Sequence, residues 1–595
     1  MLTLHARAYL IGLATCIAAA FHGSASADNP DYNQGVIVAQ QQMIPLPDGV
    51  RLAARVVRPL DQTKPLPVVA IITPYNADGV HEAGVTYVHA GYVFAAVDVR
   101  GRGDSEGVFS PLKDAGPDGA QAVEWLAKQP WCDGRVVLIG GSYVGMVQWQ
   151  ILAQHPKHLA AIIPTASVYP GYDVPNWKGV MTSEIIQWLA LVSGHSVNFD
   201  LYSDGDYWGT QLAHMYKTGA PFSSLAPLTS SNQPVVEEWL QHHGYDAYWA
   251  AYNPDPKAYS SVDIPILAVT GYFDGDQPGE MRYYRELSQN ASDAEKSRLY
   301  LLIGPWDHNG THHPRKEVGG LTIPDNALLN IEQLRISWLD WVLKGGKRPE
   351  MLSDRVNYYS LGDGAGEWHH TSSLDGVSDH VLKFYLSSVD GPADDVFHSG
   401  RLITTQPADT DADTFRSDPS ALNGMYAVDG SDANVLTDPR QAFKKPRLIY
   451  QSAPLTTSIT IAGFMRLTSN ISLDTPDADI AAEVDAVLPD GRTQVLGTDY
   501  VRARYRYGTS REALVTPGKI EPYVFDGFYL TGRQLPAGTR IRVLLAPLDT
   551  PDLEKNDNTG GPLGVNPTNH GRVTTISVHL DAAHPSYLEL PLAKD

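Results

Sequence analysis

The sequence contains almost no cysteine: Cys16 and Cys132 are the only two among 595 residues. Cys16 lies in an apolar N-terminal segment that we expect to be removed, which leaves Cys132 alone. A single cysteine cannot form an internal disulfide, so hydrophobic cores must hold the fold, and a chain of this length can build them. Cys132 lies in a turn with no histidine nearby in sequence, which argues against a nucleophilic thiol.

Positive charge is also scarce. The chain has 45 Lys and Arg against 67 Asp and Glu, a net charge of −22. A surface of this charge repels nucleic acid and anionic lipid, so we expect neither as a partner. Beyond the N-terminus, no segment stays apolar and uncharged over the about 20 residues that cross a bilayer. We therefore expect no membrane span.

The N-terminus has the pattern of a secretory signal peptide. Arg7 is its only full positive charge, residues 8–21 are almost purely apolar, and Ala25-Ser26-Ala27 is a small-residue cleavage pattern. The alternative is a membrane anchor, but the apolar stretch is shorter than about 20 residues. We expect a secreted or periplasmic protein cleaved near Ala27. Whether Cys16 carries a lipid is left open.

Strands and helices alternate in the first part of the mature chain. Asp48-Gly49 indicates a hairpin, and "PVVAIITPY" (67–75) and "YVFAAVDVRGRGDSEG" (92–107) begin as buried strands. A helical pattern follows at 118–129, and then a strand that ends in "LIGGSYVG". This alternation predicts a mostly parallel α/β sheet.

The pattern then changes twice. Residues 170–260 are rich in Tyr, Trp, His and Ser with helical stretches, which indicates an inserted cap. Buried strands return at 264–274 and 298–308, and from about residue 350 short alternating strands predict an all-β domain, most simply a jelly roll. The predicted division is a signal peptide (1–27), a core in two parts (28–166 and 262–348), a helical cap (167–261) and a jelly-roll domain (349–595).

A serine occupies the turn between a predicted strand and helix, in Gly140-Gly141-Ser142-Tyr143-Val144-Gly145. Such a turn exposes its side chain above the sheet, next to the amides of the helix start. The common signature is Gly-x-Ser-x-Gly, and here the last glycine comes one place late. The alternative is a glycine-rich turn packed for steric reasons. A dinucleotide site is disfavoured because Gly-x-Gly-x-x-Gly is absent.

A catalytic serine requires an acid and a histidine at the ends of later strands. Asp274 follows one buried strand in "AVTGYFDGD", and His308 follows the next in "LLIGPWDHNG". Asp307 competes with Asp274 as the acid. A neighbour in sequence is badly placed to hold the imidazole ring from behind, so we favour Asp274.

At this point the chain resembles a family, the cocaine esterase/α-amino acid ester hydrolase group, related to S15-type X-Pro dipeptidyl-peptidases. The resemblance runs from about residue 40 to the end and is carried by "DGVRLAARVVRP", "TPYN", "DVRGRGDSEG", "GGSYVGMVQWQ", "GYFDG" and "IGPWDH". It implies an α/β-hydrolase core with an inserted helical cap and a C-terminal all-β jelly-roll domain. It also implies Ser142 as nucleophile, His308 as base and Asp274 as its acid. The oxyanion donors would be the Tyr143 backbone N–H and the Tyr75 hydroxyl.

The resemblance also suggests how substrate is held. Relatives that prefer α-amino acid esters bind the ammonium group with a carboxylate cluster, for which Asp173 and Asp276 are candidates. The third position reads Gln277, a neutral amide, so the cluster is incomplete. The alternative is that both aspartates are solvated loop residues. Trp306 is a further pocket candidate.

We therefore expect a serine hydrolase that cleaves an ester or amide of a small-molecule substrate through an acyl-enzyme, without a cofactor. The rival reading is a carbohydrate- or cell-wall-binding protein with a degenerate hydrolase core. The loop with His308, His312 and His313 lacks a usual zinc pattern, and we expect the acidic loops at 409–413 and 476–479 to be solvated, so no metal is predicted. The natural substrate and the oligomeric state are left open.

Overall fold

The structure, a computed structural model, describes residues 35–113, 115–389, 392–407, 412–422 and 447–593. The predicted signal peptide, its cleavage site near Ala27 and Cys16 lie outside these residues. Within them, no helix combines the length and apolarity needed to cross a membrane.

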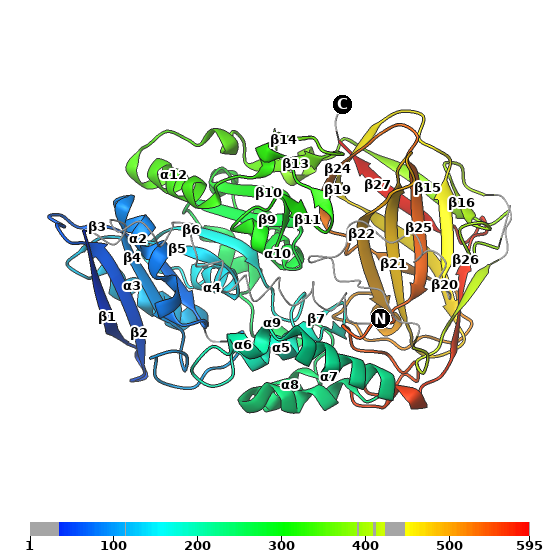
Figure 1. The fold of residues 1–595 in the computed structure, drawn as a ribbon, viewed down its shortest axis with the longest axis horizontal. Coiled ribbons are helices and arrows are strands. Elements are labelled where there is room, and N and C mark those ends of the chain that lie inside the picture. The colour runs from blue at the N-terminus through cyan, green and yellow to red at the C-terminus, as the bar shows by residue number, and fades with distance from the viewer. Residues whose placement is uncertain (1–34, 114, 390–391, 408–411, 423–446, 594–595) are drawn as a thin grey trace.

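The first half of the chain forms one large sheet (Figure 1). Hydrogen bonds give the strand order β1-β2-β4-β3-β5-β6-β9-β10-β13-β14, which is parallel from β4 to β13. The strands are β1 (Val36–Pro45), β2 (Arg51–Pro59), β3 (Leu66–Thr73), β4 (Val93–Asp98), β5 (Cys132–Ser142), β6 (Leu159–Ser167), β9 (Ile266–Phe273), β10 (Leu299–Asp307), β13 (Val356–Leu361) and β14 (Gly366–Thr371).

Apolar composition explains why these strands lie inside. Every residue of β4, β9 and β10 is buried, as expected for parallel strands covered on both faces. Helix α4 is buried on all sides, and its sequence is accordingly apolar except for Gln148 and Gln150. The mostly parallel sheet confirms the predicted α/β class. The helices of this part are α2 (His81–His89), α3 (Ala115–Ala127), α4 (Tyr143–Leu152), α10 (Gln277–Asn290), α11 (Asp293–Lys296) and α12 (Ile331–Lys344).

A mostly helical segment separates β6 from β9 and lies along the lower edge of the molecule (Figure 1). We call it the cap. Its elements are β7 (Asn176–Trp177), β8 (Val180–Met181), α5 (Glu184–Leu191), α6 (Phe199–Tyr202), α7 (Gly205–Thr218), η2 (Phe222–Asn232), α8 (Gln233–Trp239), α9 (Ala247–Ala250) and η3 (Pro256–Ser261).

The C-terminal part is all β, as predicted. Its strands are β15 (His380–Ser387), β16 (Gly400–Ile403), β17 (Asp413–Ser417), β18 (Leu448–Ser452), β19 (Ile459–Phe464), β20 (Arg466–Leu473), β21 (Asp479–Val487), β22 (Thr493–Arg502), β23 (Glu521–Phe525), β24 (Leu530–Leu535), β25 (Arg540–Pro547), β26 (Thr574–His579) and β27 (Tyr587–Leu592). They enclose their own hydrophobic core. The more specific description of this β-domain as a jelly roll stays a prediction.

The sheet of the core continues past residue 349, where the sequence suggested a boundary. β13 pairs with β10 of the core and also meets β24 of the β-domain. The exact domain limits therefore stay predictions. The described residues also contain short elements: β11 (Glu317–Val318), β12 (Leu321–Thr322), η1 (Ala77–Val80), η4 (Asn309–Thr311), η5 (Asp325–Ala327), η6 (Glu350–Leu352), η7 (Leu374–Gly376), η9 (Ala503–Tyr505) and η10 (Thr568–His570).

The β-domain is bonded to the loop that follows β9. The Gln277 side chain donates to the carbonyl of Leu530 at 3.1 Å and accepts the Leu530 N–H at 2.7 Å. The Tyr529 hydroxyl donates to the Gly275 carbonyl at 3.2 Å. Two domains therefore fix the position of the loop that carries Asp274 and Asp276.

Candidate active site

Ser142 lies at a strained turn between β5 and α4. Its backbone has φ 59° and ψ −127°, outside the regions that non-glycine residues favour. Small neighbours make the turn possible, because a Cβ on Gly141 would overlap the His312 ring and one on Gly145 would overlap Ser167. The late glycine of the motif is thus required by close packing of α4 on β6.

The acid and the histidine that the sequence singled out meet in the structure. His308 Nδ1 lies 2.8 Å from Asp274 Oδ1. Asp274 is fully buried and also accepts hydrogen bonds from the Thr270 hydroxyl at 2.9 Å and the Asp276 N–H at 3.1 Å. Asp307 instead accepts the Gly310 N–H at 2.6 Å. Asp274, and not Asp307, therefore lies against the His308 ring, and its role as the catalytic acid stays a prediction.

One pocket of about 1190 Å³ contains both Ser142 and His308 in its lining. The Ser142 hydroxyl donates to Asp276 Oδ2 at 3.4 Å, and the same oxygen lies 3.5 Å from His308 Nδ1. Among the hydrogen bonds of the described residues, none joins Ser142 to His308 directly. Catalytic hydrogen bonds are often long or misaligned before substrate binds, so the arrangement is compatible with a serine–histidine pair.

The carboxyl groups of Asp274 and Asp276 and the imidazole of His308 influence one another's pKa values. Burial raises the pKa of Asp276 well above its usual range. Burial alone would lower the pKa of His308, but the carboxylates of Asp276 and Asp274 outweigh it and raise that pKa to about 10. Asp276 and His308 thus compete for one proton. Any group that neutralises Asp276 makes His308 a better base at neutral pH.

Both predicted oxyanion donors line the same pocket. Tyr143 is the first residue of α4, where backbone N–H groups have no partner within the helix. The Tyr75 hydroxyl accepts a hydrogen bond from the Trp188 indole at 2.9 Å. The rings of Tyr75 and Tyr143 pack edge to face with centroids 6.4 Å apart.

The three candidate substrate contacts differ in position. Asp276 lines the pocket, with 18% of its side chain exposed. Asp173 is only 7% exposed and is absent from the pocket lining; it lies against Gly279 and accepts the Tyr169 N–H at 2.6 Å. The reading of Asp173 as a solvated loop residue is therefore wrong.

Trp306 lies in the core. It is fully buried, its indole donates to the Ala327 carbonyl at 2.9 Å, and it is absent from the pocket lining. Trp306 therefore does not form part of the pocket wall, contrary to the prediction.

Several pocket residues had no signal in the sequence. Glu184 and Trp188 come from cap helix α5, and Arg335 comes from α12. Arg335 Nη2 donates to the Thr165 hydroxyl at 2.9 Å and lies 3.1 Å from His312 Nδ1. Burial lowers the pKa of His312 well below its usual range, so this imidazole is neutral. These residues are far apart in sequence, and only the folded cap and α12 reveal that they share a pocket.

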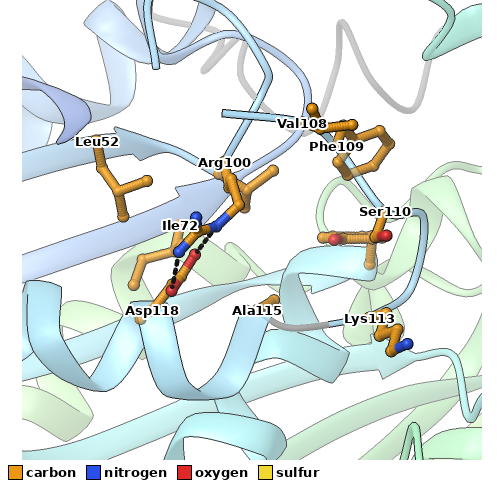
Figure 2. Close-up of a pocket in the computed structure, with 12 residues that line it drawn as sticks. Leu52, Ile72, Arg100, Val108, Phe109, Ser110, Lys113, Ala115 and Asp118 are labelled. Carbon is orange, nitrogen blue, oxygen red and sulfur yellow. Dashed lines mark hydrogen bonds and ion pairs between the residues drawn. The ribbon is translucent and has the colours of Figure 1, made fainter. Parts of the chain in front are cut away.

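A second, smaller pocket of about 350 Å³ shares Tyr143 as a wall residue (Figure 2). Its lining is mainly apolar. The charged pair within it is Arg100 and Asp118, joined by hydrogen bonds of 2.8 and 2.9 Å. Lys113 and Ser110 also line this pocket, but its lining contains no histidine and no second carboxylate that could activate either of them.

Two clusters of described residues bring possible metal ligands within 4.8 Å of one another: Asp274, Asp276 and His308, and Asp394, Asp395 and His398. In the first, His308 Nδ1 is already paired with Asp274 Oδ1 at 2.8 Å. In the second, the histidine ring pairs with Asp395 at 3.1 Å. That the enzyme uses no metal stays a prediction. Of the acidic loop 409–413, residues 409–411 lie outside the described residues.

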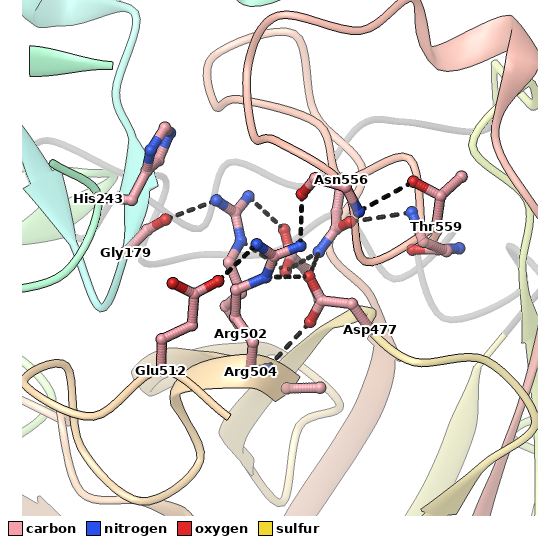
Figure 3. Close-up of polar contacts among 12 residues, drawn as sticks. Gly179, His243, Asp477, Arg502, Arg504, Glu512, Asn556 and Thr559 are labelled. Atoms are coloured by element: carbon pink, nitrogen blue, oxygen red, sulfur yellow. Dashed lines mark hydrogen bonds and ion pairs between the residues drawn. The ribbon is translucent and has the colours of Figure 1, made fainter. Parts of the chain in front are cut away.

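The other acidic loop is not solvated, contrary to expectation. Asp477 is fully buried and Asp479 is 3% exposed. Arg504 binds Asp477 at 2.7 Å, and Arg502 binds Asp479 at 2.8 Å (Figure 3). Guanidinium groups occupy carboxylate oxygens that a calcium ion would need. Arg502 also donates to the Gly179 carbonyl at 2.5 Å, which ties the cap to the β-domain.

Comparison with known proteins now bears on this site. The model of the X-Pro dipeptidyl-peptidase (S15 family) matches residues 48–310, and that of the X-Pro dipeptidyl-peptidase C-terminal non-catalytic domain matches residues 351–589. The chain belongs to the S15 family of serine hydrolases. Membership confirms the resemblance seen in the sequence, and it makes the protein a hydrolase of the esterase and peptidase kind.

Individual relatives agree with this assignment over nearly the whole chain. A cocaine esterase of Rhodococcus sp. (strain MB1 Bresler) is 27% identical over 585 residues, which cover 94% of this chain and 99% of the relative. An aminopeptidase from a marine sediment archaeon, Thaumarchaeota archaeon, superimposes with a TM-score of 0.80 at 22% identity, covering 94% and 97% of the two chains. An α-amino acid ester hydrolase gives 0.79 at 20% identity, covering 96% and 100%. The two structures establish an α/β-hydrolase fold.

Proposed function

We propose that this S15-family enzyme cleaves an ester or amide bond through an acyl-enzyme formed on Ser142. His308 takes the Ser142 proton as the hydroxyl attacks the carbonyl carbon, and returns it to the leaving group. Asp274 holds the imidazole and stabilises its protonated form. The observation that carries this proposal is the 2.8 Å contact of His308 with buried Asp274, in the pocket that Ser142 enters from its strained turn.

The negative charge that develops on the carbonyl oxygen needs two donors. We assign them to the backbone N–H of Tyr143 and the hydroxyl of Tyr75, which both line the pocket. The N–H comes from the start of α4, where the helix dipole also favours an anion. The edge-to-face packing of the two rings supports a fixed relative position.

For the substrate we favour an ester or amide of an amino acid with a free α-amine. Asp276 supports this, because its Oδ2 lies 3.4 Å from the Ser142 hydroxyl. A carbonyl carbon about 3–3.5 Å from that hydroxyl has its α-nitrogen two bonds away, within reach of Asp276. The relatives named as α-amino acid ester hydrolase and aminopeptidase agree with this choice. The relative named as cocaine esterase favours the second candidate, an uncharged aryl ester.

The test is the hydrolysis of a chromogenic ester by Ser142→Ala, with Ser110→Ala as the control. Ser110 lines the smaller pocket and takes no part in the proposed chemistry. We expect Ser142→Ala to lose about 10⁴- to 10⁶-fold in kcat and the control to keep full activity. A Ser142→Ala enzyme with a tenth of wild-type turnover would contradict the acyl-enzyme. A protein with a degenerate core would show no turnover even before substitution.

We also propose that residues 1–27 direct export and are removed near Ala27, as their sequence pattern suggests. N-terminal sequencing of the protein recovered from the periplasm or medium tests this. A start at Asp28 is expected. A start at a lipid-modified Cys16 would establish the lipoprotein alternative.

A further inference from the structure

A residue of the cap touches the proposed oxyanion donor Tyr75. The indole N–H of Trp188, on α5, donates to the Tyr75 hydroxyl oxygen at 2.9 Å, and both side chains are buried. An indole can only donate, so the phenol oxygen is the acceptor in this contact. The phenol proton must then point away from Trp188. A side chain of the cap thus sets the direction in which Tyr75 donates.

The same indole also packs on the second proposed donor residue. The rings of Trp188 and Tyr143 are stacked, with centroids 5.9 Å apart and an interplanar angle of 23°. Trp188, Tyr75 and Tyr143 all line the large pocket. One cap side chain therefore contacts both residues that would stabilise the oxyanion.

The buried side chain of Arg102 connects the segment that carries Tyr75 to the segment that follows α5 in the cap. Arg102 is fully buried, and its guanidinium donates only to main-chain carbonyls in the hydrogen bonds of the described residues. Burial lowers its pKa to about 10, so it stays charged at neutral pH. The carbonyls belong to the residue before Tyr75 and to the chain just after α5: Pro74 at 2.9 Å, Val192 at 2.8 Å, Ser196 at 3.2 Å, and Gly194.

We propose that Trp188 is a positioning residue of the oxyanion hole, which makes the cap a part of the catalytic apparatus. Trp188 directs the phenol proton of Tyr75 toward the reacting carbonyl. Arg102 fixes the distance between the chain beside Tyr75 and the chain after α5. A hydrogen bond donated to the phenol oxygen also strengthens the one that the phenol donates. Its benefit is greatest when the carbonyl oxygen carries charge, so it acts on kcat more than on KM. The inference rests on the proposed role of Tyr75.

A double-mutant cycle on an uncharged aryl ester tests the inference. Trp188→Phe keeps an aromatic ring but loses the N–H, and we expect kcat to fall about 3- to 10-fold with KM nearly unchanged. Tyr75→Phe should lower kcat about 10²- to 10³-fold. In the Tyr75→Phe background, Trp188→Phe should cost less than about twofold, because the group it orients is gone.

Trp208→Phe is the matched control. Trp208 is a buried cap tryptophan on α7 whose indole donates to the Leu201 carbonyl at 2.8 Å, away from the pocket, so kcat should not change. Should Trp188→Phe perturb folding, the sulfur isostere benzothienylalanine at position 188 keeps the shape and removes only the donor.

The outcomes separate the inference from the proposed function. An equal loss from Trp188→Phe with and without the Tyr75 hydroxyl, or no loss in kcat, overturns the inference and leaves the role of Tyr75 intact. An unchanged kcat in Tyr75→Phe overturns the role of Tyr75 itself, and the inference with it.

Discussion

Asp276→Asn removes a charge from the pocket while keeping the size of the side chain. If Asp276 binds the substrate ammonium, the variant should lose its preference for amino-bearing esters. A hydrogen bond to a charged group contributes about 1.5–3 kcal/mol, and with only 18% of the Asp276 side chain exposed, solvent screens it little. This corresponds to a fall of about 10- to 150-fold in the kcat/KM ratio of an amino acid ester to its N-acetylated form.

The same substitution should change the pH dependence in a defined direction. The Asp276 carboxylate raises the pKa of His308 against the lowering effect of burial, so a neutral amide at this position lowers that pKa. Catalysis needs unprotonated His308, and activity therefore rises as pH increases through this pKa. The acid limb of kcat/KM for an uncharged aryl ester should move to lower pH. At low pH the variant should cleave this ester faster than the wild type does.

The assay compares one acyl group in two forms, with a free and an acetylated amine, below about pH 7, where the α-amine is charged. Asp293→Asn is the control, because Asp293 is fully exposed on α11 and does not line the pocket. An unchanged preference in Asp276→Asn would refute the amine site. An acid limb that stays in place would refute the charge coupling between Asp276 and His308.

Three further predictions concern the scaffold. Gly145→Ala should lower both the melting temperature and kcat, since its Cβ would overlap Ser167 and the Thr165 carbonyl; a fully active, equally stable variant would show that the late glycine is not required. Arg502→Met should lower the free energy of unfolding by about 3–5 kcal/mol in urea titrations, because it leaves buried carboxylates unpaired, whereas Arg492→Ala at the surface should change little. A chain ending at residue 350 should be insoluble or inactive in expression trials, since it exposes the β10 edge and frees the loop after β9; full activity would contradict an integral β-domain.

The sequence predicted the parts of the fold that local pattern controls. Runs of apolar residues identify β3, β4, β5, β9 and β10, and the Asp48-Gly49 turn identifies the hairpin of β1 and β2. The contact of Asp274 with His308 was predictable because parallel strands end at one edge of a sheet, so their following residues meet there.

The pocket beyond these residues was not predictable. Trp188 reaches Tyr75 only because the cap folds over the sheet, and no spacing in the sequence encodes that contact. Trp306 is close in sequence to His308, and Asp173 is a candidate by resemblance to relatives, but both are buried and absent from the pocket lining. Gln277 occupies the third position of the expected carboxylate cluster. Its amide forms two hydrogen bonds with the backbone of Leu530 in the β-domain, and a carboxylate could not form both of them.

The most direct test of the central claim is to locate the nucleophile chemically. The enzyme is treated with a fluorophosphonate, digested, and the modified residue is identified by tandem mass spectrometry. The account predicts a single adduct on Ser142 that forms much more slowly in His308→Gln, because the imidazole activates the hydroxyl. An adduct on another residue, or none on the active wild-type enzyme, would contradict the assignment of Ser142 as the nucleophile.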